Sequence, residues 1–195
     1  GEANITTAAG DVATFQSTGA DTVQCISYVK ADGTAVVSSG GITLGTEQAL
    51  SGTAIDFTGI PSGTKRITVM FDGVSTDGTE ELILQLGDSG GFETSGYNSG
   101  AWMDTTTASR TTGFGLQETM SSNAANIYGT IILVLEDASD FTWTYISALY
   151  ADQTTDKNQL GAGSKSLSAE LTQIRITTTN TPDDFDAGVI NISYE

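Results

Sequence analysis

The residues of this chain that could do chemistry are almost all carboxylates. The sequence has no histidine and a single cysteine, Cys25, which removes Ser-His-Asp triads, Cys-His dyads and zinc sites built on His or thiolate ligands. A carboxylate pair, as in glycoside hydrolysis, is the remaining catalytic arrangement. With 24 acidic residues among 195, close pairs arise by chance. We therefore predict that the chain is not an enzyme.

The densest acidic cluster is "TPDDFDAG", which contains Asp183, Asp184 and Asp186. It separates two strand-like runs, and Asp side chains commonly accept hydrogen bonds from backbone amides in turns. We expect a turn in which these side chains cap the backbone, in preference to a catalytic group.

A second group of acidic residues lies in "FDGVSTDGTEE", where Asp72 and Asp77 precede Glu80 and Glu81. Carboxylate oxygens suit hard cations, and calcium is the ion to test here. The spacing does not match an EF-hand loop. A turn with solvated charges is therefore the favoured interpretation, with Asp72 and Asp77 as the alternative calcium ligands. No other cofactor is expected.

The segment from Gly87 to Gly113 lacks strand periodicity and is rich in Gly, Ser and Thr. Loops of this length in compact domains are usually functional or disordered. Aromatic rings can stack on the apolar faces of sugars while Asn and Asp oxygens bind hydroxyl groups. This reasoning gives four candidate ligand-binding residues, Tyr97, Asn98, Trp102 and Asp104. The alternative is that the aromatic residues only pin a long loop onto the domain.

Alternating residues predict β-strands along most of the chain, and no segment keeps a helical period. Residues 11–17 and 22–29 read as a hairpin, and a Gly- and Ser-rich stretch follows. Further strands are expected at 54–57, 65–71, 80–86, 113–117, 127–136, 142–150, 164–171, 173–179 and 189–194. The run "IYGTIILVLED" is apolar on both faces, which predicts a central strand covered on both sides.

These patterns predict an all-β fold: a jelly-roll-like antiparallel β-sandwich preceded by a small N-terminal β-hairpin module. We place the module at residues 1–40, a Gly/Ser-rich linker at 41–52 and the sandwich at 53–195. Because the chain begins "GEAN" without Met, we expect it to be a fragment of a longer protein.

The net charge of −17 argues against a nucleic-acid partner, because phosphates require clusters of Lys and Arg. The sequence has no apolar run of about 20 residues, so no membrane insertion is expected. A chain this acidic would meet an anionic cell surface only through a neutral sugar epitope or through bridging divalent cations.

Several blocks of the chain carry a resemblance to a known family: "AIDFTGIPSGTKRITVMFDGVSTDGT", "LQLGDSGGFETSGYNS", "GSKSLSAELTQIRITTTN" and "DDFDAGVINISYE". They resemble a domain at the C-terminal ends of tail-fibre and other appendage proteins of tailed bacteriophages. The N-terminal "AGDVATFQSTGADTVQCISYVKADGTAV" is similar to the short β module that often precedes such tips. Gly63 and Asp77 depart from the pattern, in turns and not in the core.

The resemblance implies a virion protein, assembled as a homotrimer with other phage tail or appendage proteins. Its terminal sandwich would bind a glycan or an outer-membrane protein of the bacterial host surface without chemistry. The alternative is a structural module for trimerisation or decoration of a tail or capsid appendage, without receptor contact. Apolar residues on outward strand faces would mark that alternative, with Met70, Ile83, Phe141 and Trp143 as candidates. A depolymerase is disfavoured because no β-helix repeat is visible.

Overall fold

The computed structural model describes residues 7–33, 41–103, 106–116, 125–153, 156–179 and 183–195. The chain divides into two compact units, residues 1–41 and 42–195. Within the described ranges the regular structure is entirely β, and they contain no apolar helix of membrane-spanning length.

The described residues of the first unit form one antiparallel hairpin. Strand β1 (Val12–Gly19) pairs with β2 (Thr22–Val29), as the turn residues between them predicted. Asp21 in the turn has a left-handed φ of 57°. At the open end, the Asp11 carboxylate accepts hydrogen bonds from the Tyr28 hydroxyl and from two backbone amides. The described part of this unit is therefore held together by the pairing of β1 with β2 and by the hydrogen bonds to the Asp11 carboxylate.

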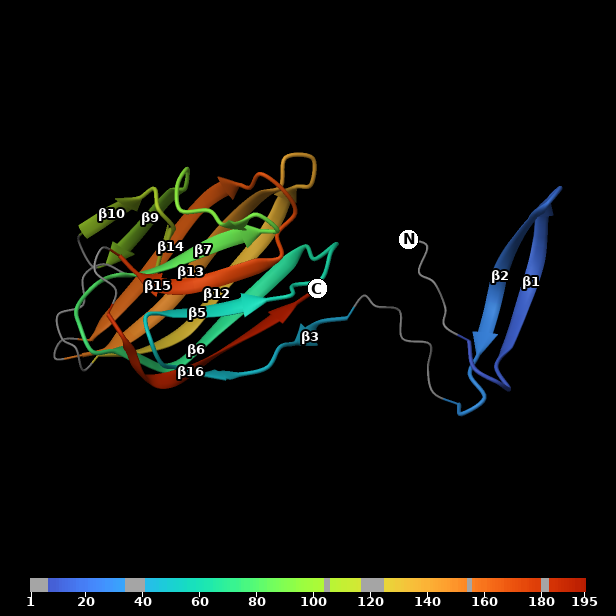
Figure 1. The fold of residues 1–195 in the computed structure, drawn as a ribbon, viewed down its shortest axis with the longest axis horizontal. Helices are drawn as coiled ribbons and strands as arrows, with labels where there is room; N and C mark the ends of the chain where they lie inside the picture. The colour runs from blue at the N-terminus through green and yellow to red at the C-terminus, as the bar shows by residue number, and fades with distance from the viewer. Residues whose placement is uncertain (1–6, 34–40, 104–105, 117–124, 154–155, 180–182) are drawn as a thin grey trace. The chain divides into compact units, whose positions relative to one another are not determined.

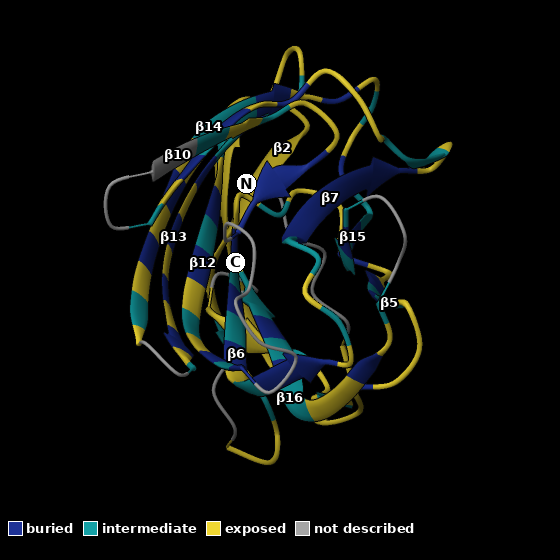
Figure 2. Cartoon of the chain, turned by 90° about the vertical axis from the view of Figure 1, so that its left-hand side faces the viewer, coloured by how far each residue is buried: buried dark blue, intermediate teal, exposed yellow. Residues whose placement is uncertain are grey.

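The second unit is a sandwich of two antiparallel sheets (Figure 1). The large sheet has nine strands in the order β10-β9-β14-β13-β12-β6-β16-β3, with β4 also on β16; the small sheet has five, β11-β7-β15-β5, with β8 on β7. Figure 2 shows the large sheet curving around the small one. The prediction of an all-β antiparallel sandwich is confirmed. The strand bounds are β3 Thr43–Leu44, β4 Gln48–Ala49, β5 Ala54–Thr58, β6 Arg66–Thr76, β7 Leu82–Asp88, β8 Gly91–Phe92, β9 Asn98–Met103, β10 Thr106–Arg110, β11 Phe114–Gly115, β12 Asn126–Asp137, β13 Thr142–Asp152, β14 Lys157–Ser166, β15 Gln173–Thr178 and β16 Phe185–Tyr194.

Alternating side chains from both sheets fill the space between them. In β7, Leu82, Leu84 and Leu86 are fully buried, and in β6 Ile67 and Val69 are fully buried as well. Burying side chains of this size contributes about 1.5–3 kcal/mol each. The period-2 pattern that predicted both strands therefore marks the core face of each sheet.

Strand β12 lies centrally in the large sheet, but only one of its faces is covered. Ile131 and Leu133 are fully buried, whereas Val134 on the opposite face is 41% exposed and Ile132 is partly exposed. The prediction that both faces of this strand are buried is therefore wrong. The described residues do not form a further layer over the outward side of β12, so its apolar residues Val134 and Ile132 remain at least partly exposed.

Part of the segment expected to be a linker, residues 41–52, belongs to the large sheet. Strands β3 and β4 pair with β16, and Leu50 is 9% exposed and packs in the core. The compact unit accordingly begins at Ile42.

The segment expected to be a long loop, 87–113, contains strands β9 and β10 at the edge of the large sheet. Its inward residues in β9 include Ser99 and Ala101, which lack the large apolar alternation that identifies a strand. Gly163 on β14 permits the pairing, because a Cβ there would lie 2.4 Å from the Asn98 carbonyl oxygen. The adjoining strand β14 also begins earlier than the predicted 164–171.

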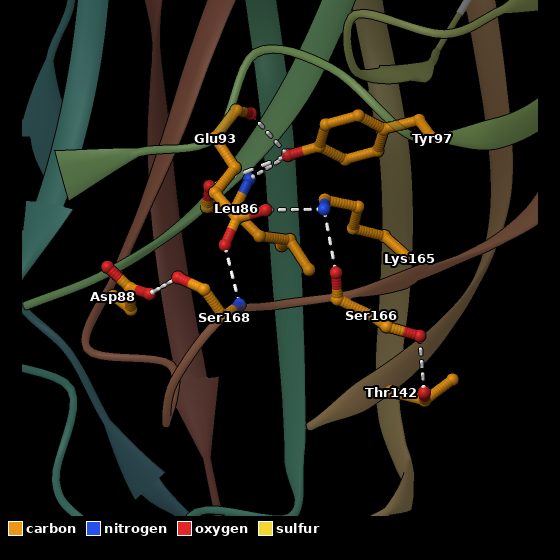
Figure 3. Close-up of polar contacts among 8 residues, drawn as sticks. All are labelled: Leu86, Asp88, Glu93, Tyr97, Thr142, Lys165, Ser166 and Ser168. Atoms are coloured by element: carbon orange, nitrogen blue, oxygen red, sulfur yellow. Dashed lines mark hydrogen bonds and ion pairs between the residues drawn. The ribbon is translucent and has the colours of Figure 1, made fainter. Parts of the chain in front are cut away.

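A polar group that we call the inter-sheet anchor connects the two sheets beside β9 (Figure 3). Lys165 on β14 is 7% exposed, and its ammonium pairs with the Glu93 carboxylate, which follows β8 of the small sheet. The ammonium also donates to the Ser166 carbonyl oxygen at 2.7 Å and lies 5.6 Å from the centre of the Tyr97 ring. Glu93 in turn accepts the Ser168 amide at 2.7 Å.

The electrostatics of the anchor favour ionised Glu93. Burial opposes ionisation, but the Lys165 ammonium and the Ser168 amide outweigh it and leave the pKa of the Glu93 carboxyl below its ordinary value of 4.5. The folded chain therefore binds this proton more weakly than the unfolded chain does. Stability from the anchor is fully present above about pH 4.5 and is lost as the pH falls through the lowered pKa of Glu93.

Glu93→Gln should destabilise the sandwich by roughly 3 kcal/mol near neutral pH, because it leaves the Lys165 ammonium buried without its carboxylate. The measurement is urea unfolding of both proteins. Glu170→Gln is the matched control, since the exposed Glu170 carboxylate also accepts a backbone amide, and it should change stability by less than about 1 kcal/mol. The difference in the free energy of unfolding between wild type and Glu93→Gln should narrow below about pH 4.5. A difference that does not change with pH would contradict a stabilising role of ionised Glu93.

Candidate functional site

A cleft of about 560 Å³ opens at the end of the small sheet where β7 begins and β15 ends. We call it the polar cleft. Three parts of the chain meet there: the approach to β7, the stretch from the end of β10 towards β11, and the end of β15. Its lining residues are Thr79, Glu80, Glu81, Ile83, Gln85, Arg110, Thr112, Thr178 and Thr179.

The outward side of β7 forms the floor of the polar cleft. Ile83 and Gln85 alternate with the core leucines of that strand, yet they are only 3% and 7% exposed. The Gln85 carboxamide donates to the Thr112 carbonyl oxygen at 2.9 Å. Gly113 approaches Ile83 so closely that an added Cβ would lie 3.1 Å from its side chain. The floor therefore combines a packed apolar side chain with an oriented carboxamide.

An ion pair forms one wall. The Arg110 Nε donates to the Glu81 carboxylate at 2.6 Å, and an Nη atom contacts the same oxygen. The two side chains are 23% and 15% exposed, so the pair is shielded from solvent on most sides. It fixes the end of β10 against the start of β7.

The opposite wall is held by the acidic turn before β16. The Glu80 amide donates to the Asp183 carboxylate at 2.8 Å, and the Asp183 amide donates to the Thr178 hydroxyl at 3.0 Å. The Thr179 hydroxyl donates to the Glu80 carboxylate at 2.8 Å. The Asp183 side chain thus caps a backbone amide, but that amide belongs to the segment before β7, and residues 180–182 of the predicted turn lie outside the described residues.

The lining of the polar cleft is suited to hydrogen bonding with a ligand that carries several hydroxyl groups. Threonine hydroxyls and carboxylate oxygens line the cleft, over a floor in which Ile83 and Gln85 are almost fully buried. The hydroxyl groups of a saccharide can donate hydrogen bonds to such groups and accept hydrogen bonds from them. Because bonds within the protein already fix these groups, little ordering is needed on binding.

Tyr97, the first of the four candidate ligand-binding residues, lies in the core. It is 3% exposed, and its ring packs edge-on against Phe114 with the ring centres 5.0 Å apart. Its hydroxyl accepts the Leu86 amide at 2.7 Å and donates to the Glu93 carbonyl oxygen at 2.9 Å (Figure 3). Burial raises the pKa of the phenol well above its ordinary value. Tyr97 therefore pins the segment to the sandwich and presents no face to a ligand.

Two further candidates, Asn98 and Trp102, are not part of the lining of the polar cleft. Asn98 and Trp102 lie on β9, where both are exposed, Trp102 by 47%. The register places them on the outward side of the large sheet, opposite Ser164 and Leu160. Asp104 lies outside the described residues.

The two candidate calcium ligands do not form a cation site together. Asp72 is exposed on β6, opposite Val189 of β16. The Asp77 carboxylate accepts the Asp184 amide at 2.9 Å, and the Asp77 amide donates to the Asp184 carbonyl oxygen at 2.9 Å. Across the described ranges, no group of three or more His, Cys, Asp or Glu side chains is arranged to hold a metal ion.

The sequence patterns did not point to the polar cleft, although one segment that they singled out contributes to its lining. Residues 87–113 supply Arg110 and Thr112 to the lining. Arg110 is the one basic residue of that segment. A lone arginine among Gly, Ser and Thr residues is the sequence feature that could have indicated a polar site there. Its partner, Glu81, lies 29 residues away in a stretch that was interpreted as a solvated turn.

Comparisons with known proteins identify no relative: no family model, no curated protein and no solved structure matches this chain.

Tyr97→Phe should lower the free energy of unfolding by about 1–3 kcal/mol, because it leaves the Leu86 amide buried without an acceptor. Tyr128→Phe is the matched control, since Tyr128 is 37% exposed, and it should stay within about 0.5 kcal/mol of wild type. Chemical denaturation measures both effects. Equal stabilities for wild type and Tyr97→Phe would contradict the anchoring role.

Proposed function

We propose that this chain is a recognition domain of a tailed-phage appendage, and that its polar cleft binds a neutral saccharide of the bacterial surface without cleaving it. The carrying observation is the polar cleft of about 560 Å³, which is lined mainly by residues with hydroxyl, carboxamide and carboxylate groups. The resemblance of several sequence blocks to appendage tips supports the viral assignment.

The charge of the chain favours a neutral ligand. A molecule of net charge −17 repels anionic polysaccharides and phosphate-rich surfaces. The single cation in the lining, Arg110, already pairs with Glu81. Neutral hydroxyl groups can approach the Thr and Gln side chains without this penalty.

Weak binding at each site is sufficient for this function. Several copies on one particle raise the effective concentration at the host surface, so avidity exceeds the affinity of a single cleft. A shallow site that contacts one or two sugar units fits such a design.

Filling the polar cleft should abolish saccharide binding. Thr112 is exposed at its rim, so Thr112→Trp should reduce binding to an immobilised panel of neutral bacterial polysaccharides at least tenfold. Thr94→Trp, an exposed position outside the lining, is the matched control and should bind like wild type. Undiminished binding by Thr112→Trp would refute the site, and release of reducing ends from the panel would refute binding without cleavage.

Chelation separates direct binding of a neutral sugar from cation bridging. Because the proposed ligand carries no charge, EDTA and added salt should each change binding to the neutral panel less than twofold. A large loss in EDTA that added calcium restores would show that a bridging cation is required.

The structural alternative, a trimerisation or decoration module, has one observation in its favour. Several large apolar side chains on the large sheet are about half exposed. Of the four residues expected to mark such a surface, Ile83 and Trp143 are buried at 3% and 2% exposure, while Met70 and Phe141 are partly exposed. Association and recognition are compatible, because they use different surfaces.

A further inference from the structure

A hollow of about 290 Å³ lies on the outward side of the large sheet, where β12, β13 and β14 are neighbours. We call it the tyrosine hollow. Ala148, a small exposed residue of β13, lines it beside Leu160, which the register places opposite Ala148. In the next row, Tyr128 is opposite Tyr150, and Tyr150 is opposite Asn158. A small side chain framed by larger ones therefore creates the depression.

Two tyrosine rings form one wall of the tyrosine hollow. Tyr128 and Tyr150 are each 37% exposed, their ring centres lie 6.3 Å apart, and their ring planes are inclined by 32°. At this spacing one cation can lie within about 6 Å of both ring centres, which is the range of cation–π attraction. The Leu160 side chain, 48% exposed, adds an aliphatic surface to the lining. The walls of the hollow are therefore largely apolar and partly aromatic.

Carboxylates stand beside the aromatic wall. Asp152 follows Tyr150 by two positions on β13, so it belongs to the same outward side, and it is exposed. The Tyr150 hydroxyl donates a hydrogen bond to the Asp156 carboxylate. Partial loss of solvent, together with the charges of Asp156 and Asp152, raises the pKa of the Tyr150 phenol. Lys157 belongs to the inward series of β14, opposite the buried Ala151. The rim next to Tyr150 is therefore negative.

Apolar walls beside a negative rim select one kind of cation. Calcium and magnesium take shells of oxygen ligands, and a primary ammonium group is strongly hydrated, so neither gains from an apolar wall. A quaternary ammonium group presents methyl groups to its surroundings, and it is recognised by aromatic rings through cation–π attraction. The volume of about 290 Å³ lies at the lower end of small-ligand sites, which suits a head group of this size.

We propose that the tyrosine hollow binds a quaternary ammonium group of the choline type. The net charge of −17 attracts cations to the surface of the chain, and the hollow adds an apolar and aromatic contact that hydrated ions cannot use. This inference goes beyond saccharide recognition and stands independently of it, since the tyrosine hollow and the polar cleft share no lining residue.

The first test is an NMR titration of the full chain with choline chloride, which replaces sodium chloride so that the ionic strength stays constant. The backbone amide signals of Ala148 and Tyr150 should shift and saturate in the millimolar range. The neutral carbon isostere of choline, in which a tert-butyl group replaces trimethylammonium, should bind at least tenfold more weakly because it lacks the charge. Equal binding of the isostere, or no saturable shift with choline, would overturn the proposal.

Variants locate the binding in the tyrosine hollow. Tyr150→Leu removes one ring and should weaken choline binding at least fivefold, and Ala148→Leu should have a similar effect because it fills the hollow. Trp102→Leu is the matched control: it removes an exposed ring from the same side of the sheet but outside the lining, and it should bind like wild type. Thermal unfolding reports whether each variant is folded. Folded Tyr150→Leu and Ala148→Leu variants that bind choline like wild type would overturn the site.

Vesicles of phosphatidylcholine distinguish two sources of the quaternary ammonium group. Sedimentation of the chain with the vesicles, lost in Tyr150→Leu, assigns the tyrosine hollow to a lipid head group. Choline binding without sedimentation assigns it to a soluble cation. Absence of both would overturn the proposal, and it would leave saccharide binding in place, because Thr112→Trp tests the polar cleft separately.

Discussion

The inter-sheet anchor is the constraint on which the placement of β9 and β10 depends. The Glu93 carboxylate, which follows β8 of the small sheet, pairs with the Lys165 ammonium on the large sheet. The Tyr97 ring lies against the same ammonium, with its centre 5.6 Å away. A buried ion pair is retained only when further hydrogen bonds offset the loss of solvent, and Ser166 and Ser168 supply them. Strand β9 begins immediately after Tyr97, so the anchor sets where the edge of the large sheet starts.

From that edge, one stretch of chain serves two opposite sides of the sandwich. β9 places Trp102 on the outward side of the large sheet, and β10 returns to bring Arg110 to Glu81 at the polar cleft. The polar cleft is lined by hydroxyl and charged groups, whereas Trp102, Ile146 and Leu160 on the outward side of the large sheet are exposed apolar residues. The two sides of the sandwich therefore differ in chemistry.

The strands that could be predicted from the sequence are those in which apolar side chains alternate along the strand. The alternation in β6 and β7 identified their buried faces because one side of each strand meets the core. The sequence pattern did not predict β9, because its inward residues are small. The pairing of β9 depends on Gly163 and on the inter-sheet anchor and not on a local pattern. The polar cleft could not be predicted from a local pattern either, because it brings together Glu81, Arg110 and Thr179 from three segments of the chain. Tyr97 and Trp102 looked equivalent in sequence, and only the strand register separates the buried ring from the exposed one.

An NMR titration with a neutral saccharide selected from the polysaccharide panel tests the central claim most directly. The Gln85 carboxamide reports on the polar cleft, and the Trp102 indole N–H reports on the outward side of the large sheet. If the cleft is the recognition site, the Gln85 carboxamide and the Thr179 amide signals shift in proportion to ligand while the Trp102 indole signal stays in place. A shift of the Trp102 indole with unchanged cleft signals would contradict the account and move recognition to the outward side of the large sheet.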